Sequence, residues 1–280
     1  MSIIKRATGL LVIEVRDSNP NGDPDRESDP RQRSDDKGAI SPVSFKRKLR
    51  DLVERKTGPV WESISKEFSP ALAADKFMIS ESRETKLKEM RALNEKQFTE
   101  NFWDGRIFGN TELEKGRNIP VKTGVVQFGL GVSLAPIRVE RMTTTNPPVQ
   151  EEKKGGMAPL AYRIAQHGVY CMPFFVNPTA AIKTECTRED IDVLLKMIPY
   201  AYPHTASYIR PYVEIRHAWY IEHKSVLGSC SDFALIDALT PKKKTDPEKA
   251  SISWDEYDVP TKLPDELQKK VEPLRDLMNQ

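Results

Sequence analysis

Two stretches near the start of the chain carry side chains that together could bind a phosphate backbone. Residues 17–25 form a polar loop, Asp-Ser-Asn-Pro-Asn-Gly-Asp-Pro-Asp, whose Asn side chains and backbone amides can contact a ligand. Residues 45–50 form a basic run, Phe-Lys-Arg-Lys-Leu-Arg. Lysine and arginine neutralise phosphates without reading bases, and such binding weakens as salt is added. The combination favours nucleic-acid binding, although a solvated helix face would also account for the basic run.

The polar loop also has a superficial match to a calcium-binding EF-hand loop. Asp17, Asn19 and Asn21 occupy alternating positions before Gly22. The twelfth position of such a loop is a bidentate Glu, and here it is Ser28. A polar turn shaped by Asn and Pro is the favoured alternative. A calcium-responsive interaction module is a third alternative, and no metal site is predicted.

One strand and one helix must position these side chains. Residues 8–16 are mostly apolar and β-branched, which is the pattern of a central strand. A helix opens at Ser41, with proline in its first turn. Its apolar side chains share one face: Phe45, Leu49, Leu52 and Val53. Lys46 and Arg50 flank one side of that face and Lys48 flanks the other, so the helix can bury its apolar stripe and keep cations along both rims.

The remaining pattern predicts an α+β fold. Residues 31–40 are polar and loop-like. The later elements are β-like residues 120–139, a strand over 168–176, a capped helix over 187–198 and a strand over 213–223. Strand, helix, strand, strand, helix, strand is the order of a ferredoxin-like or RRM-type core.

Two excursions interrupt this core. Residues 61–116 are a mostly helical insertion, and residues 140–163 are a protruding hairpin or loop. We therefore predict one domain over residues 1–240. Residues 241–280 are a C-terminal appendage that ends in a short amphipathic helix over residues 263–277.

Charge is nearly balanced overall but uneven along the chain. The formal net charge is +2, while residues 1–60 carry 13 Lys and Arg against 10 Asp and Glu, and residues 117–170 carry 7 against 3. A polyanion site should use these two regions. The three cysteines form no CxxC pair, and no run approaches the roughly 20 apolar residues of a membrane span. We expect a cytoplasmic protein without a membrane partner.

The start of the 140–163 excursion carries a second candidate contact. Arg141, Met142 and Thr143 are either a plain strand end or a finger that crosses a bound strand, with Met142 wedged beside a base. The four histidines are scattered, and we interpret them as structural. The sequence contains no nucleophile motif, Walker loop, dinucleotide fingerprint or HExxH, so we predict no enzyme and no cofactor.

Several motifs in order resemble one family. Residues 11–25 with residues 43–50, then 124–134 with 141–145, and finally 227–239, closely resemble the repeated backbone subunit of type I CRISPR Cascade complexes. The nearest likeness is to the type I-C and I-B branches, and it spans roughly residues 8–240.

The resemblance implies a palm with an RRM-like core, helical fingers (residues 61–116) and a thumb (residues 140–163). Copies would line up head to tail along one guide RNA, the crRNA, together with other Cascade subunits. The guide would be displayed for pairing with target DNA, so that base pairing rather than protein reads sequence. A helical filament of a non-catalytic ribonucleoprotein, active in antiviral defence, is the implied assembly.

The resemblance also implies roles for individual residues. The RNA-binding residues would be Asn19, Asn21, Lys46, Arg47, Lys48, Arg50, Gln127, Arg141, Met142, Thr143 and Arg163. The four cations of residues 46–50 would bind guide phosphates, the two Asn would shape the palm loop, and Gln127 would line the RNA path. Arg141 and Met142 would form the thumb base, and Arg163 would close the thumb. The alternative is a type III-like subunit in which Asp23 or Asp25 assists metal-dependent cleavage of target RNA.

Overall fold

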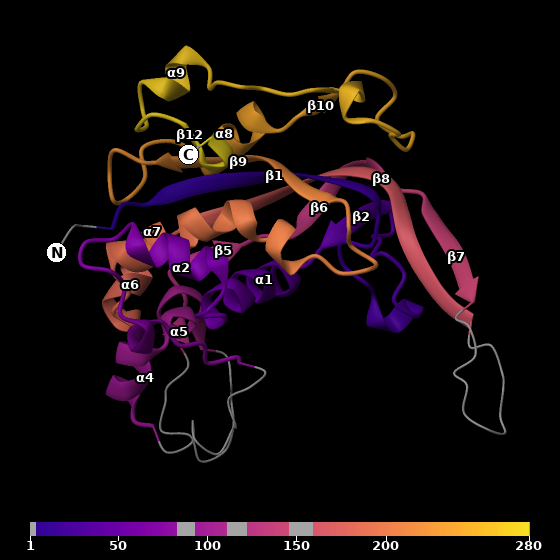
Figure 1. Cartoon of the computed structure of the whole chain (residues 1–280). Coiled ribbons are helices and arrows are strands. Elements are labelled where there is room, and N and C mark those ends of the chain that lie inside the picture. Colours follow the sequence, from indigo (N-terminus) through magenta and orange to yellow (C-terminus); the bar gives the residue numbers. More distant parts are fainter. Residues whose placement is uncertain (1–3, 83–92, 111–121, 146–158, 280) are drawn as a thin grey trace, which may run out of the picture.

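The computed structural model describes residues 4–82, 93–110, 122–145 and 159–279. Its centre is a mixed α/β arrangement around one antiparallel sheet, in the order β12-β9-β1-β8-β6-β2, with β5 and β7 also pairing with β8 (Figure 1). These strands are β1 (Ala7–Ser18), β2 (Lys37–Ile40), β5 (Val126–Phe128), β6 (Gly131–Pro136), β7 (Val139–Thr145), β8 (Pro159–Val176), β9 (Val213–Glu222) and β12 (Arg275–Asp276). Short pairs are formed by β3 (Gly109–Asn110) with β4 (Lys122–Thr123) and by β10 (Lys242–Lys243) with β11 (Tyr257–Asp258).

Helices lie on both faces of this sheet. The longer ones are α1 (Pro42–Glu54), α2 (Pro59–Lys66), α4 (Glu95–Asn101), α5 (Trp103–Phe108), α6 (Pro178–Thr184), α7 (Arg188–Met197), α8 (Asp232–Leu239) and α9 (Asp265–Gln268). Short 3₁₀ turns include η1 (Pro24–Arg26), η3 (Ile198–Tyr200) and η4 (Pro203–Thr205). Figure 1 shows α1, α2, α5 and α7 below the sheet and α8 above it. Among the described residues no helix is long and apolar enough to cross a bilayer.

The central strand and first helix predicted from sequence are confirmed. Strand β1 is almost wholly buried and pairs with β8 on one side and β9 on the other. The Ser41 hydroxyl caps α1 by accepting from the Ser44 N–H, because four N–H groups at a helix start lack helical partners. The ring of Phe45 then packs 5.1 Å from that of Phe128, so the apolar stripe of α1 closes the inner face of the sheet.

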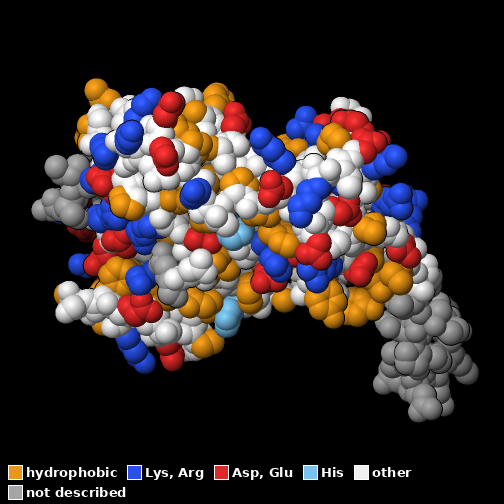
Figure 2. All heavy atoms as spheres, turned by 90° about the horizontal axis from the view of Figure 1, so that it is seen from above, with side chains coloured by type: hydrophobic (Ala, Val, Ile, Leu, Met, Phe, Trp, Pro, Cys, Tyr) orange, Lys and Arg blue, Asp and Glu red, His pale blue; other side chains and the backbone are white. Residues whose placement is uncertain are grey.

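The outer face of the sheet is covered by the C-terminal part of the chain. The outward side chains include Leu10, Val12, Val169, Trp219 and Ile221. They form one buried cluster with residues of α8 and of the segment after it, namely Leu235, Leu239, Tyr257, Leu263 and Val271. Residues 241–279 thus close the second hydrophobic layer of the sheet. Seen from above, this side of the molecule mixes acidic, basic and apolar side chains, as Figure 2 shows.

The predicted amphipathic helix over residues 263–277 is wrong. Only α9 is α-helical there, and β12 extends the sheet by pairing with β9. Pro273 lies inside the interval, and a proline within a helix removes one hydrogen bond and clashes with the preceding turn. The loop predicted over residues 31–40 is also partly wrong, because β2 pairs with β6 at the sheet edge.

A buried polar network fastens the C-terminal segment to the sheet. His167 lies between Glu14 and Ser251, with Nε2 3.3 Å from a Glu14 oxygen and Nδ1 2.8 Å from the Ser251 hydroxyl. The Tyr257 hydroxyl donates to Ser251 across 2.9 Å. All four side chains are buried. The hydrogen-bonded chain Ser251–His167–Glu14 has the residue types of a catalytic triad. Because all three side chains are buried, a substrate cannot reach them, and we interpret the network as structural.

Replacement of Glu14 by Gln is expected to flatten the acid side of the stability profile. Burial raises the pKa of Glu14, but hydrogen bonds from His167 and Arg16, with the charges of Arg16 and Arg216, outweigh it and lower the pKa to about 2. The carboxylate therefore stabilises the fold above its ordinary pKa of 4.5, and this contribution is lost as the pH falls towards about 2. Urea unfolding across this pH window should show that the free energy of unfolding falls less steeply with pH in Glu14→Gln than in wild type. Equal slopes would contradict the assignment.

Candidate nucleic-acid interface

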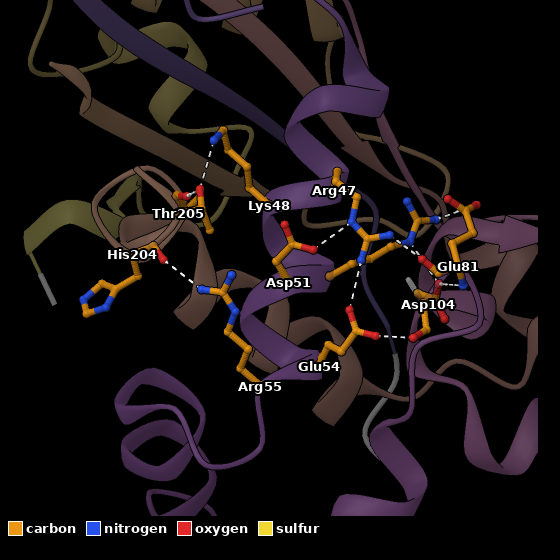
Figure 3. Close-up of polar contacts among 12 residues, drawn as sticks. Arg47, Lys48, Asp51, Glu54, Arg55, Glu81, Asp104, His204 and Thr205 are labelled. Atoms are coloured by element: carbon orange, nitrogen blue, oxygen red, sulfur yellow. Dashed lines mark hydrogen bonds and ion pairs between the residues drawn. The ribbon is translucent and has the colours of Figure 1, made fainter. Parts of the chain in front are cut away.

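Two of the four cations of α1 are occupied by carboxylates of the same chain. Arg50 is buried, with Nε 2.9 Å from an oxygen of the fully buried Asp104 and a terminal nitrogen 2.9 Å from Glu81. Arg47 pairs with Asp51 at 2.8 Å and with Glu54 at 3.2 Å. Figure 3 shows Arg47 turned toward Asp51 and Glu54. The pairs of Arg50 hold the first helix to α5 and to Glu81, whereas the carboxylate partners of Arg47 lie on α1 itself and only its hydrogen bond to the Glu81 carbonyl leaves the helix.

The two lysines of α1 are different. Lys48 Nζ donates to the Thr205 hydroxyl across 2.9 Å, on the opposite side of the helix from Arg47, and lies 4.9 Å from the centre of the Tyr202 ring (Figure 3). Lys46 Nζ lies 5.1 Å from the centre of the Phe108 ring. In the described part of the chain neither lysine forms an ion pair with a carboxylate.

Their electrostatic setting favours an added anion. Burial lowers the pKa of Lys48 to about 8, and the positive charge of Arg210 acts in the same direction. Burial and then Arg50 lower the pKa of Lys46 as well. A phosphate beside either ammonium would stabilise its charged form, because an opposite charge offsets the cost of desolvation. Lys46 and Lys48 are therefore the members of the basic run best suited to bind phosphate.

The two Asn residues of the polar loop are structural. Asn21 Oδ1 accepts from the backbone N–H of Ser41 at 2.7 Å, which ties the loop to the start of α1. Asn19 Nδ2 donates to the Ser28 carbonyl at 2.7 Å. Both side chains are buried. They shape the loop, and their contacts are with backbone.

The base of the predicted thumb is an antiparallel hairpin of β7 and β8; residues 146–158 of that prediction lie outside the described residues. Arg141 and Arg163 are directly opposite each other in this hairpin. Both reach residues 27–29, which follow the polar loop: Arg141 lies 2.8 Å and Arg163 3.2 Å from Asp29, and Arg163 also pairs with Glu27. Ion pairs thus hold the hairpin to residues 27–29.

The other predicted residues separate into two groups. Met142 and Thr143 are exposed on β7 of the same hairpin. Gln127 is exposed on β5, between Val126 and Phe128, whose buried side chains belong to the core on the α1 side of the sheet. Because successive side chains of a strand point to opposite faces, Gln127 faces away from α1. The structure does not bring it together with the lysines.

Of the two loop aspartates, Asp23 has internal contacts and Asp25 has an exposed side chain. Asp23 caps η1 by accepting from the Asp25 N–H and lies 3.6 Å from Arg31. Within the described ranges no group of three or more His, Cys, Asp or Glu residues is placed to hold a metal ion.

Sequence reasoning missed Arg210, whose charge acts on Lys48. Arg210 lies in the run Tyr208-Ile-Arg-Pro-Tyr212 that precedes β9. A basic residue between two tyrosines is a combination found on surfaces that bind single-stranded nucleic acid, and it was the available signal.

Comparisons with known proteins place the chain in a family. It is similar to a chain of a solved structure described as a CRISPR RNA-guided surveillance complex, pre-nicking, with TM-score 0.50, 14% identity and coverage of 78% of each chain. A chain of a second CRISPR RNA-guided surveillance complex gives TM-score 0.46 at 15% identity, covering 78% of this chain and 69% of that one. A chain of the type III-B Cmr-beta complex bound to cognate target RNA gives 0.43 at 12%, covering 78% and 61%. No curated protein matches significantly in sequence. The family model of CRISPR-associated protein Cas7 matches residues 5–262, and the chain therefore belongs to the Cas7 family.

Proposed function

We propose that this protein is the crRNA-binding backbone subunit of a type I CRISPR surveillance complex. The observation that carries the proposal is the match of the Cas7 family model over residues 5–262. Copies polymerise head to tail along the guide, beside other Cascade subunits, and display the guide for pairing with target DNA. The motif resemblance favours the type I-C or I-B branch. The free cysteines Cys171, Cys186 and Cys230 support a reducing, cytoplasmic setting.

The strand order supports the assignment of a ferredoxin-like palm. Along the chain, α1 follows β1 and α7 follows β8, while in space β9 and β8 flank β1 and β6 lies beyond β8. This is the arrangement of a βαββαβ core with antiparallel strands. On this proposal the helices within residues 61–116 are the fingers, the β7–β8 hairpin is the thumb base, and residues 241–280 are an appendage that seals the palm from outside.

The covered outer face decides where the guide can run. RRM domains bind single-stranded RNA on the open face of their sheet, where aromatic side chains stack on bases. Here that face is buried under α8 and the segment after it. The guide must therefore run on the opposite side of the palm, along α1 and the hairpin, where Lys46 and Lys48 lack carboxylate partners among the described residues.

We further propose that the subunit is not catalytic. The internal contacts of Asp23 with the Asp25 N–H and with Arg31 support this view. Assembled complex incubated with complementary RNA and magnesium should leave the RNA intact. Periodic cuts that disappear in Asp23→Asn would favour the type III-like alternative instead.

Co-expression of the chain with a repeat–spacer RNA, together with its genomic neighbours, is expected to give a multi-copy ribonucleoprotein. The reason is that each copy adds both protein–RNA and copy–copy contacts, so assembly follows the guide. Size-exclusion chromatography with multi-angle light scattering measures the copies per RNA. Recovery of RNA-free monomers with no affinity for single-stranded RNA at low salt would contradict the proposal.

A further inference from the structure

The β7–β8 hairpin has a second face, which its arginines do not use. Met142 is directly opposite Tyr162 in the hairpin, so the two side chains lie on the same face. Neighbouring residues of a strand point to opposite faces, which separates this pair from Arg141 and Arg163. The ring of Tyr162 packs edge-on against that of Tyr208, with 5.5 Å between ring centres. An apolar strip thus leads from the hairpin to the segment before β9.

That segment, residues 206–212, is firmly held yet presents its aromatic side chains to solvent. The carbonyls of Ile209 and Tyr212 accept from the N–H groups of Asn19 and Arg16, at 2.7 and 3.0 Å. Tyr208 and Tyr212 are nevertheless 66% and 65% exposed. Two large exposed rings on an anchored backbone lose little entropy when they bind a partner.

Two cations adjoin this segment: Arg210 lies within it, between the two tyrosines in sequence, and Lys48 donates to the hydroxyl of Thr205, the residue before it. Arg210 Nε donates to the Asn19 carbonyl at 2.8 Å, and Arg210 is close enough to Lys48 for the two charges to repel. Within the described residues no carboxylate forms an ion pair with either. Repulsion between two held cations is relieved by a bound anion. The surface therefore combines planar rings with an unmet demand for negative charge.

We propose that Tyr208 and Tyr212, with Lys48 and Arg210 beside them, form a stacking subsite for single-stranded RNA, in which the rings contact bases and the cations contact the adjoining phosphates. The proposal rests on the proposed function and deepens it. Base stacking on tyrosine accepts any base, which suits a guide whose sequence varies. The strip through Tyr162 to Met142 makes the subsite continuous with the thumb base.

The test is binding of two fluorescein-labelled probes by the purified chain: a short oligoadenylate RNA and a ribose–phosphate strand of equal length without bases. The double variant Tyr208→Ala/Tyr212→Ala is expected to weaken oligoadenylate binding roughly tenfold or more and to leave binding of the abasic strand unchanged. Its salt dependence should match wild type, because the variant keeps every cation. Tyr208→Phe/Tyr212→Phe keeps both rings and should bind like wild type.

Phe233→Ala is the matched control, since Phe233 is a 76% exposed ring on α8 at the covered face of the sheet. It should bind both probes like wild type. Unchanged oligoadenylate binding by the double alanine variant would overturn the stacking subsite. The subsite would also be overturned if the double alanine variant bound the probe normally but assembled into ribonucleoproteins with fewer copies, because the surface would then contact another copy of the chain. If wild type itself binds neither probe at low salt, the proposed function fails instead.

Discussion

Replacement of Lys46 and Lys48 by methionine is expected to weaken guide RNA binding about 100-fold or more while the fold stays intact. Each lysine is a cation without a carboxylate partner among the described residues, and a hydrogen bond to a charged group contributes about 1.5–3 kcal/mol. Two such contacts together correspond to roughly 100-fold to 10⁴-fold in affinity. Methionine keeps the apolar stem that packs on Phe108 and Tyr202, so packing is preserved.

Fluorescence anisotropy at several salt concentrations measures this effect. On a single strand, the slope of log affinity against log salt should fall by roughly 0.7 for each phosphate that the variant no longer neutralises. Lys249→Met is the control, because Lys249 is an 80% exposed lysine of the C-terminal segment. If the double variant and this control have the same RNA affinity and the same salt slope, α1 does not bind phosphate.

Lys48 makes the RNA affinity depend on pH. Burial, with the charge of Arg210, places the pKa of Lys48 at about 8 in the free protein. A lysine binds phosphate only when protonated, so affinity should fall as the pH rises through this value, and should fall less in Lys48→Met. Anisotropy titrations of both proteins across this pH range measure the difference, and identical pH profiles would contradict the role of Lys48.

Replacement of Arg50 by methionine is expected to destabilise the fold by about 3–5 kcal/mol, because it leaves a buried charge without its partner. That charge is Asp104, whose side chain is fully buried and also accepts from the Ser80 N–H at 2.7 Å. Urea unfolding followed by circular dichroism gives the free energy of unfolding. Loss of RNA binding in an Arg50 variant would therefore report on folding.

Lys96→Met is the control for Arg50→Met. Lys96 forms an exposed ion pair with Glu100 at 3.6 Å on α4, and such pairs contribute about 1 kcal/mol or less. If Arg50→Met shifts the urea midpoint no more than Lys96→Met does, the buried Arg50–Asp104 pair does not stabilise the fold.

The elements predicted correctly are those whose pattern is local. β1 is marked by a continuous apolar and β-branched run, and α1 by apolar residues with a 3.6-residue period and by the capping residue Ser41. β2 and β12 carry weak local signals, since each forms only through pairing with a strand distant in the chain.

In the candidate site, too, some features are local in the sequence and others depend on contacts between distant residues. The cations of α1 were visible in the sequence, but the partner that neutralises Arg50 lies 54 residues away. Which cations remain available for phosphate depends on such contacts, and only the folded chain shows them. The run Tyr208-Ile-Arg-Pro-Tyr212 carried a local signal, but only the fold brings Tyr208 against Tyr162 in the hairpin.

The guide is expected to run along the α1 side of the palm and not over the outer face of the sheet. Ultraviolet cross-linking of the assembled ribonucleoprotein, followed by mass spectrometry, tests this path most directly. Nucleotide adducts are expected on peptides that contain residues 41–55 and 203–212. Adducts confined to residues 226–239 and 251–258, on the covered face, would contradict it.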